Sequence, residues 1–156
     1  QVTYAVQNAD YLTNENAWQK TSAHTREIIS LGVLLLVAKN FQNSKPPTRA
    51  SELHKQLRVP SHILNSSINR LCELGYLTII GGNSTEDDRD QAYLPGYPLE
   101  SISLGAFKQT FERHGNNEGA ELIAEIAPGV RTYLDNIVSL KGCPQAKLTI
   151  SELIRQ

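Results

Sequence analysis

The sequence predicts a mainly α-helical fold with a small β-wing, the winged helix-turn-helix. Two sets of apolar residues at helical spacing lie on either side of Pro60 and Ser61, within the segment 48–74. Spacings of three and four residues place each set on one face of a helix. Gly75 then stands where the end of a helix favours a left-handed residue, and residues 76–80 are rich in β-branched and aromatic side chains. Helix, short turn, helix, strand, polar loop and strand is the element order of a winged helix.

Residues 1–20 form the predicted N-terminal arm or juxtamembrane linker. The arm is polar with scattered aromatic residues, and Trp18 is expected to pack it onto the core. The chain contains no Met, not even at position 1, which indicates a piece excised from a longer protein.

Residues 21–115 form the predicted winged-helix domain. Thr21 or Ser22 can cap a helix that runs to Gln42 and is apolar nearly all round, as expected for a helix in the centre of a core. Thr48 is expected to cap the next helix, because the two prolines before it exclude a continuing helix.

The wing follows the second helix of the pair. Residues 81–91 are polar turn-formers and form the predicted wing tip, and residues 92–95 form the second of two predicted wing strands. Ser103 can then cap a helix over Leu104–Arg113.

Residues 116–156 form the predicted C-terminal helical extension. Pro128 is expected to start a new helix within it, and residues 148–154 form a short amphipathic tail. The extension carries more apolar residues than a short helix pair can hide, so we expect it to pack across the winged helix or to make a dimer. These residues are Leu122, Ile123, Ile126, Val130, Tyr133, Leu134, Ile137 and Val138.

Composition limits the function classes. The net charge of −1 gives no overall attraction to nucleic acid or to an anionic membrane, and no apolar run approaches the ~20 residues that span a bilayer. Two cysteines, Cys72 and Cys143, are too few for a disulfide framework; the first is expected to be an inert core thiol and the second to be more exposed.

The polar face of the second helix, with neighbouring cations, is the candidate contact surface for DNA or for a protein partner. Asn and Arg can read base edges, and Ser can contact phosphate. The candidate residues are Lys45, Arg49, Lys55, Arg58, Ser61, His62, Asn65, Ser66, Asn69 and Arg70.

Charge weighs against DNA at this surface. Residues 44–80 carry a net charge of +3, but the charged run 86–90 within the wing tip carries a net charge of −3. Because phosphate neutralisation dominates affinity for DNA, an acidic wing would be repelled. The charge balance therefore favours protein contact, or a purely structural use of the fold, over specific DNA binding.

Catalytic and metal sites find no support in the sequence. The chain has no phosphate-binding glycine motif, no nucleophile elbow and no pair of histidines at ligand spacing, and its acidic run lacks the register of a calcium loop. We therefore predict no enzyme, no cofactor, no metal site and no small-molecule substrate.

Two flanking segments carry a family resemblance. The run PPTRASELHKQLRVPSHILNSSINRLCELGYL with AYLPGYPLESISLGAFKQTF, and the N-terminal QVTYAVQNADYL, resemble the C-terminal domain of the YihY/BrkB membrane proteins, long labelled ribonuclease BN-like. The resemblance covers roughly residues 1–115. It implies a domain on the cytoplasmic face of the bacterial inner membrane, attached through a transmembrane region absent from this sequence, that acts through a protein partner or self-association. No residue in this sequence provides the catalytic groups that a ribonuclease activity would need.

The segment AYLPGYPLESISLGAFKQTFE is also similar to iron–sulfur transcription regulators of the IscR/NsrR type, with Leu94-Pro95, Ile102-Ser103-Leu104 and Phe107 at matching places. That family holds its cluster with three closely spaced cysteines after this helix, and this chain has none between Cys72 and Cys143. The alternative prediction is therefore a DNA-binding transcription-regulator domain without an iron–sulfur cluster.

Overall fold

The computed structural model describes residues 16–81, 90–115, 117–140 and 143–155. The chain divides into two compact units, with the boundary in the sequence between Tyr97 and Pro98.

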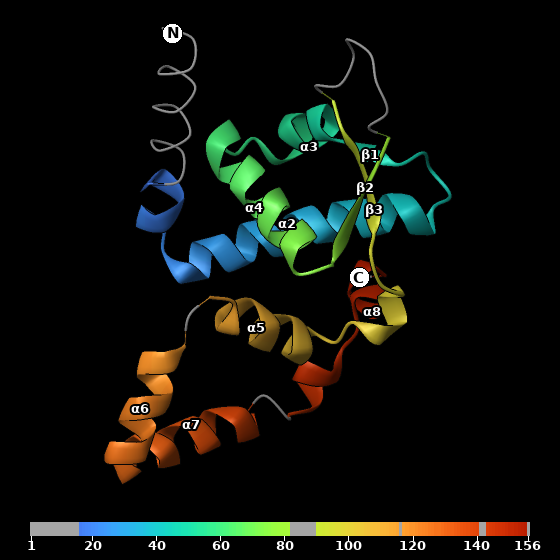
Figure 1. Ribbon diagram of the computed structural model, residues 1–156. Coiled ribbons are helices and arrows are strands. Elements are labelled where there is room, and N and C mark those ends of the chain that lie inside the picture. Colours follow the sequence, from blue (N-terminus) through green and yellow to red (C-terminus); the bar gives the residue numbers. More distant parts are fainter. Residues whose placement is uncertain (1–15, 82–89, 116, 141–142, 156) are drawn as a thin grey trace, which may run out of the picture. The chain divides into compact units, whose positions relative to one another are not determined.

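The first unit is a winged helix, which confirms the predicted fold class. Its helices are α2 (Ala23–Gln42), α3 (Ala50–Leu57) and α4 (Ser61–Glu73). Its strands are β1 (Thr48–Arg49), β2 (Leu77–Ile80) and β3 (Ala92–Pro95), which form an antiparallel sheet in the order β1-β3-β2. In Figure 1 the long helix α2 lies behind α4, and the three strands gather at one side of the unit.

The core of this unit lies between α2 and α4. The Ser22 hydroxyl accepts a hydrogen bond from the Thr25 amide and caps α2, as predicted. From α2 the core receives Val33, Leu34, Val37 and Ala38, and from α4 it receives Leu64, Ile68 and Leu71. Ile28 and Phe41 remain about half exposed, so α2 is less fully enclosed than its apolar sequence predicts.

The prediction that Thr48 caps the third helix is wrong. Thr48 pairs with Tyr93 in the sheet, and its buried hydroxyl accepts a hydrogen bond of 3.0 Å from Nδ2 of Asn40. The two-residue strand β1 makes the sheet three-stranded instead of two-stranded. A β-branched residue fits a half-buried strand, and the hydroxyl satisfies a buried amide that would otherwise cost stability.

The turn from α4 into β2 needs glycine at two positions. Gly75 has φ +77°, as predicted for the residue that ends this helix. Gly96 lies against it from the other wing strand, and a Cβ on Gly96 would stand 2.0 Å from the carbonyl oxygen of Gly75. The two glycines therefore allow the base of the wing to close on the end of α4.

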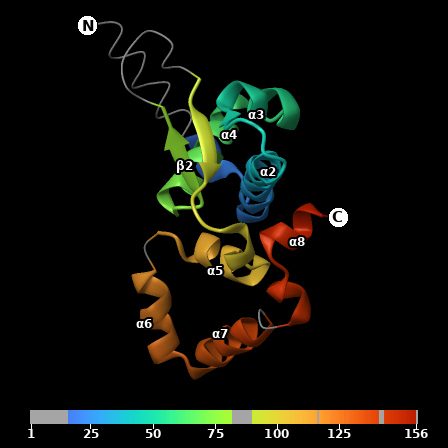
Figure 2. The same ribbon diagram turned by 90° about the vertical axis from the view of Figure 1, so that its right-hand side faces the viewer.

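The second unit consists of short helices. They are the 3-10 helix η1 (Leu99–Ser101), α5 (Leu104–Arg113), α6 (Glu118–Ile126), α7 (Pro128–Leu140), the 3-10 helix η2 (Pro144–Lys147) and α8 (Ile150–Ile154). Ser103 caps α5 and Pro128 opens α7, as predicted. Figure 2 shows α5, α6 and α7 following one another around an arc. Thr149 and Glu152 form a capping box that fixes the start of α8.

The predicted domain boundaries lie after residues 20 and 115, whereas the structure divides the chain after Tyr97. The predicted boundaries are not tested by this division and remain predictions. The extension keeps several exposed apolar side chains: Leu122, Ile123, Ile126, Tyr133 and Leu134. Their role as a packing or dimer surface also remains a prediction. None of the helices in the described ranges is long and apolar enough to cross a membrane.

Candidate nucleic-acid interface

The turn between α3 and α4 presents the start of α4 to solvent. Arg58 ends α3 with φ 52° and ψ 32°, a left-handed conformation that costs a non-glycine residue free energy. Pro60 precedes α4 and disfavours a continuous helix. The helix-turn-helix predicted from the interrupted apolar pattern is therefore present.

The predicted contact residues of α4 lie on its outer side. Ser61, Asn65 and Asn69 are exposed, whereas His62, Ser66 and Arg70 are half-buried. The Ser66 hydroxyl donates a hydrogen bond of 2.9 Å to the carbonyl oxygen of His62. Three polar side chains at helical spacing thus remain accessible along α4.

The two helices of the pair are joined by a polar contact. Nε2 of His54, on α3, lies 3.2 Å from Oδ1 of Asn65 on α4. Because an amide oxygen can only accept, Nε2 is the donor of this hydrogen bond. His54 therefore fixes the orientation of an exposed amide on α4.

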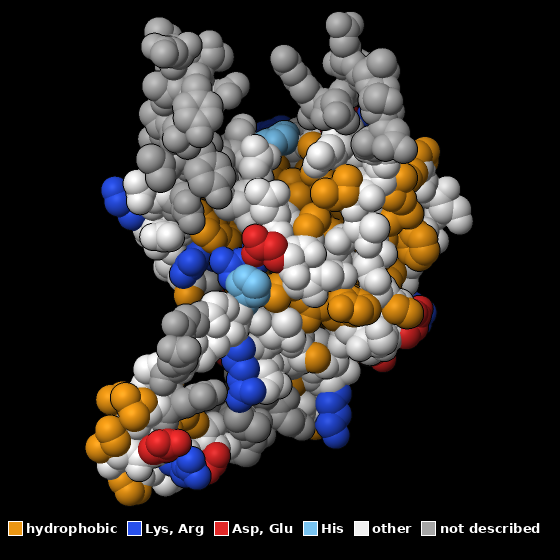
Figure 3. Space-filling model, viewed as in Figure 1, with side chains coloured by type: hydrophobic (Ala, Val, Ile, Leu, Met, Phe, Trp, Pro, Cys, Tyr) orange, Lys and Arg blue, Asp and Glu red, His pale blue; other side chains and the backbone are white. Residues whose placement is uncertain are grey.

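The five predicted cations differ in whether they form ion pairs with carboxylates of the same chain. Nη1 of Arg49 lies 3.8 Å from Oδ2 of Asp90, and Nε of Arg70 lies 3.7 Å from Oε2 of Glu73. The other three, Lys45, Lys55 and Arg58, are exposed and form no ion pair within the described residues. On the face that Figure 3 draws, Lys and Arg side chains are scattered and do not form a continuous stripe.

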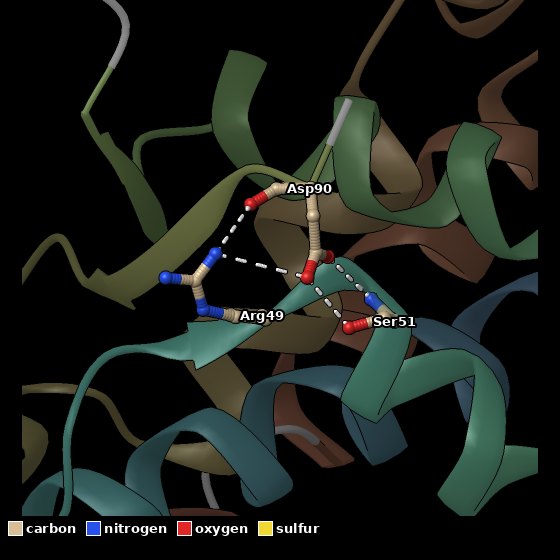
Figure 4. Close-up of polar contacts among 3 residues, drawn as sticks. All are labelled: Arg49, Ser51 and Asp90. Carbon is tan, nitrogen blue, oxygen red and sulfur yellow. Dashed lines mark hydrogen bonds and ion pairs between the residues drawn. The ribbon is translucent and has the colours of Figure 1, made fainter. Parts of the chain in front are cut away.

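Asp90 connects the base of the wing to α3. Its Oδ1 accepts a hydrogen bond of 2.8 Å from the Ser51 amide, and its Oδ2 accepts one of 2.7 Å from the Ser51 hydroxyl (Figure 4). These two hydrogen bonds hold the pKa of the Asp90 carboxyl below its usual value, with a smaller contribution from the Arg49 guanidinium. Since the Arg49 side chain does not cap α3, Asp90 supplies the cap from the segment that leads into β3.

A hollow of about 260 Å³ opens beside α4. Its lining comes from α4, the first residue of α3, the residue before β3, and β3 itself: Ala50, Asn65, Ile68, Asn69, Gln91 and Tyr93. The buried Tyr93 hydroxyl donates a hydrogen bond of 3.1 Å to Oε1 of Gln91. Burial is the main reason that the pKa of Tyr93 lies above its usual value, with smaller contributions from Cys72 and Asp90.

The remaining sequence predictions concern cysteines, metals and the wing. Cys72 is half-buried, and burial, followed by the Glu73 charge, raises the pKa of its thiol; Cys143 is exposed. Within the described ranges, no group of three His, Cys, Asp or Glu side chains could hold a metal ion. Of the predicted wing tip, residues 82–89 lie outside the described residues, and the structure describes Gly81, Asp90 and Gln91 at its two ends.

The sequence predicts the exposed face of α4, but it does not predict the residues that contact that face from other parts of the chain. Asn65 and Asn69 were identified from their spacing, and the structure places both beside one hollow. His54 was not identified because its contact joins α3 to α4. Gln91 and Tyr93 were not identified because only the fold brings them beside α4. The acidic wing drew attention to Asp90, but no sequence pattern pointed to its bond with Ser51.

Comparison with known proteins identifies similar folds. No family model and no curated protein matches the chain. CymR of B. subtilis, the global cysteine regulator, is 19% identical with a TM-score of 0.52, over 87% of this chain and 96% of CymR. CymR of Staphylococcus aureus is 16% identical with a TM-score of 0.53, over 85% of this chain and 97% of that one. A protein from Listeria innocua assigned as a transcriptional regulator is 19% identical with a TM-score of 0.52, over 85% of each chain.

These findings correct the principal functional prediction. The resemblance to YihY/BrkB membrane proteins is wrong, because no family model supports it and the similar solved structures include CymR of two bacteria. The predicted domain of a membrane protein, and its place on the cytoplasmic face of the inner membrane, are wrong with it. At these identities the comparisons show the winged-helix fold.

Proposed function

We propose that the chain is a DNA-binding transcription regulator, not an enzyme, and that it places α4 in the major groove of DNA. The observation that carries this proposal is the exposed polar face of α4, where Ser61, Asn65 and Asn69 follow one another at helical spacing. Amide and hydroxyl side chains on an exposed helix are suited to hydrogen bonding with base edges and phosphates. The similarity in fold to CymR supports the same reading.

Cations beside α4 supply the attraction to phosphate. Lys55 lies on α3, Arg58 lies in the turn before α4, and Lys45 lies in the loop that leads into β1. None of the three forms an ion pair within the described residues, so their charges are available to a ligand. Arg58 keeps a left-handed conformation in which glycine would be less strained, a cost that a contact with DNA would explain.

The negative charges around the wing limit the affinity without preventing binding. Asp90 is engaged by Ser51 and Arg49, so its charge is partly compensated. With three free cations in each protomer, we expect the logarithm of the binding constant to fall with the logarithm of salt concentration with a slope of about −3, modest for a DNA-binding protein.

Self-association belongs to the proposal. Hydrophobic side chains gather on the α6–α7 pair in Figure 3, and Leu122, Ile126 and Tyr133 are each more than half exposed. Exposed apolar surface of this kind marks interaction sites, and most soluble homo-oligomers are symmetric dimers. A dimer would present two α4 helices to two half-sites of a palindromic sequence.

The experiment measures binding of the chain to mixed duplex DNA by fluorescence anisotropy at several salt concentrations. Lys55→Ala and Arg58→Ala should each weaken binding of every sequence and should each reduce the salt slope by about 1. Lys147→Ala is the matched control, because Lys147 is an exposed lysine in the second unit, and it should leave the slope unchanged. Equal effects of all three variants would contradict a contact surface centred on α4.

A further inference from the structure

The hollow beside α4 is lined by three residues that carry side-chain carboxamides. Asn65 and Asn69 come from α4, and Gln91 comes from the segment that enters β3. Ala50 and Ile68 add apolar surface to the lining. A carboxamide carries one accepting oxygen and one donating NH₂ group, so what it offers a ligand depends on which end its neighbours occupy.

Two of the three amides each accept a hydrogen bond from a neighbouring side chain through the amide oxygen. Nε2 of His54 donates to Oδ1 of Asn65 over 3.2 Å, and the Tyr93 hydroxyl donates to Oε1 of Gln91 over 3.1 Å. Tyr93 is buried, and its hydroxyl is protonated at neutral pH because the usual pKa of tyrosine, about 10, lies far above 7 and burial raises the pKa further. One lone pair of each oxygen is thereby engaged, while the NH₂ groups of Asn65 and Gln91 form no hydrogen bond within the described part of the chain.

We propose that this hollow is a base-reading site that accepts the major-groove edge of guanine. The proposal rests on the proposed function and names the base that the surface selects. Guanine presents two acceptors in the major groove, O6 and N7, whereas adenine presents one acceptor and one donor. Two NH₂ groups match the two guanine acceptors, whereas the adenine donor would have to share an amide oxygen that His54 or Tyr93 already engages.

The charges around the hollow favour a base over a phosphate. Asp90 precedes Gln91 in the chain, and its carboxylate binds Ser51, the residue after Ala50. A phosphate in the hollow would therefore lie near a fixed negative charge, which raises its free energy. A guanine edge carries no net charge, and the apolar surfaces of Ala50 and Ile68 suit the flat base.

His54 and Tyr93 act in this account as positioning residues that determine specificity. Both hold an amide oxygen, and neither is required to touch DNA. Removal of either neighbour frees an oxygen to accept, so the amide can then make the paired contact with adenine that Asn and Gln side chains favour. Loss of these residues should change which base is preferred more than it changes affinity for DNA in general.

The experiment determines the base preference of the full chain by selection from a pool of randomised DNA duplexes. The unaltered chain should prefer guanine at one position in each half-site, by about tenfold. His54→Ala and Tyr93→Phe should reduce this preference to about twofold by admitting adenine. Asn65→Asp should exclude guanine and favour cytosine, because a carboxylate only accepts and cytosine offers a donor.

Tyr97→Phe is the matched control for Tyr93→Phe. Tyr97 is an exposed tyrosine close to the same wing, and it does not line the hollow. Its variant should keep the guanine preference. Circular dichroism of each variant checks that it is folded, and the near-isosteric Tyr93→Phe keeps the test decisive if His54→Ala unfolds.

The outcomes separate this proposal from the proposed function. An unchanged base profile in Tyr93→Phe and Asn65→Asp, with DNA binding retained, overturns the guanine site and leaves the regulator standing. If these variants instead lose affinity equally for all DNA sequences, the hollow contacts phosphate, and the guanine site is also overturned. Failure of the unaltered chain to bind any duplex overturns the proposed function and the guanine site together.

Discussion

Replacement of Asp90 should change stability and DNA binding in opposite directions. Asp90→Ala removes the cap that Asp90 supplies to the Ser51 amide and hydroxyl, at distances of 2.8 and 2.7 Å. Loss of a helix cap costs about 1 kcal/mol. The ion pair with Arg49 adds little, because it spans 3.8 Å and the arginine side chain is 64% exposed. We therefore expect the free energy of unfolding to fall by about 1 kcal/mol.

The same substitution frees a cation for DNA. Without Asp90, Arg49 has no carboxylate partner within the described residues and can contact phosphate. The affinity of Asp90→Ala for duplex DNA at low salt should rise about tenfold, and the salt slope should steepen by about 1. Urea titration followed by circular dichroism measures the first effect, and fluorescence anisotropy across a salt series measures the second.

Asp90→Asn separates the cap from the charge. Asparagine caps helices about as well as aspartate, so this variant should keep most of the stability while it gains affinity for DNA. The pKa of Asp90 is lower in the folded protein than in the unfolded chain, so the carboxylate stabilises the fold. This stabilisation is complete at a pH above the usual Asp pKa of about 4, and it is lost as the pH falls further. The stability gap between the unaltered chain and Asp90→Ala should therefore close in acid. A gap that persists in acid, or an Asp90→Asn variant as unstable as Asp90→Ala, would refute this account of the cap.

Three further predictions, one of them with a control variant, concern the fold and the turn. Gly96→Ala should lower the free energy of unfolding by about 2–3 kcal/mol, because its Cβ would stand 2.0 Å from the Gly75 carbonyl oxygen. In the control Gly129→Ala the added Cβ meets no atom within 4 Å, so this variant should be neutral or stabilising. Urea titration compares the two variants, and equal effects would contradict the close approach. Ser67→Ala should raise the free energy of unfolding by about 1 kcal/mol, because the buried Ser67 hydroxyl has no hydrogen-bond partner within the described structure, and a loss of stability would show that a partner exists. Arg58→Gly should raise the free energy of unfolding by about 0.5 kcal/mol by relieving a left-handed residue, and it should weaken DNA binding; a variant that binds DNA as tightly as the unaltered chain would remove Arg58 from the interface.

Most helices could be predicted from the sequence because their signals are local. Ser22, Ser103 and Pro128 mark helix starts through interactions within one turn, and the structure confirms each. The strand β1 could not be predicted in this way. Thr48 has the sequence context of a helix cap, and its pairing with Tyr93, 45 residues away, decides its conformation.

The site shows the same limit. The spacing of Asn65 and Asn69 identifies the exposed face of α4, but the contacts with His54 and Gln91 depend on how separate elements pack. The sequence also misled on function, since the central winged-helix pattern is shared by proteins with different roles and the flanking residues pointed to a membrane family. A fold carries many functions, and the role must be argued from the site.

The most direct test of the central claim is binding of the unaltered chain to a pool of random duplexes across a salt series. The account predicts dissociation constants in the micromolar range or tighter at low salt, a salt slope of about −3 for each protomer, and enrichment of a palindromic sequence. Absence of binding at the lowest salt, where electrostatic attraction is strongest, would contradict a DNA-binding function for α4.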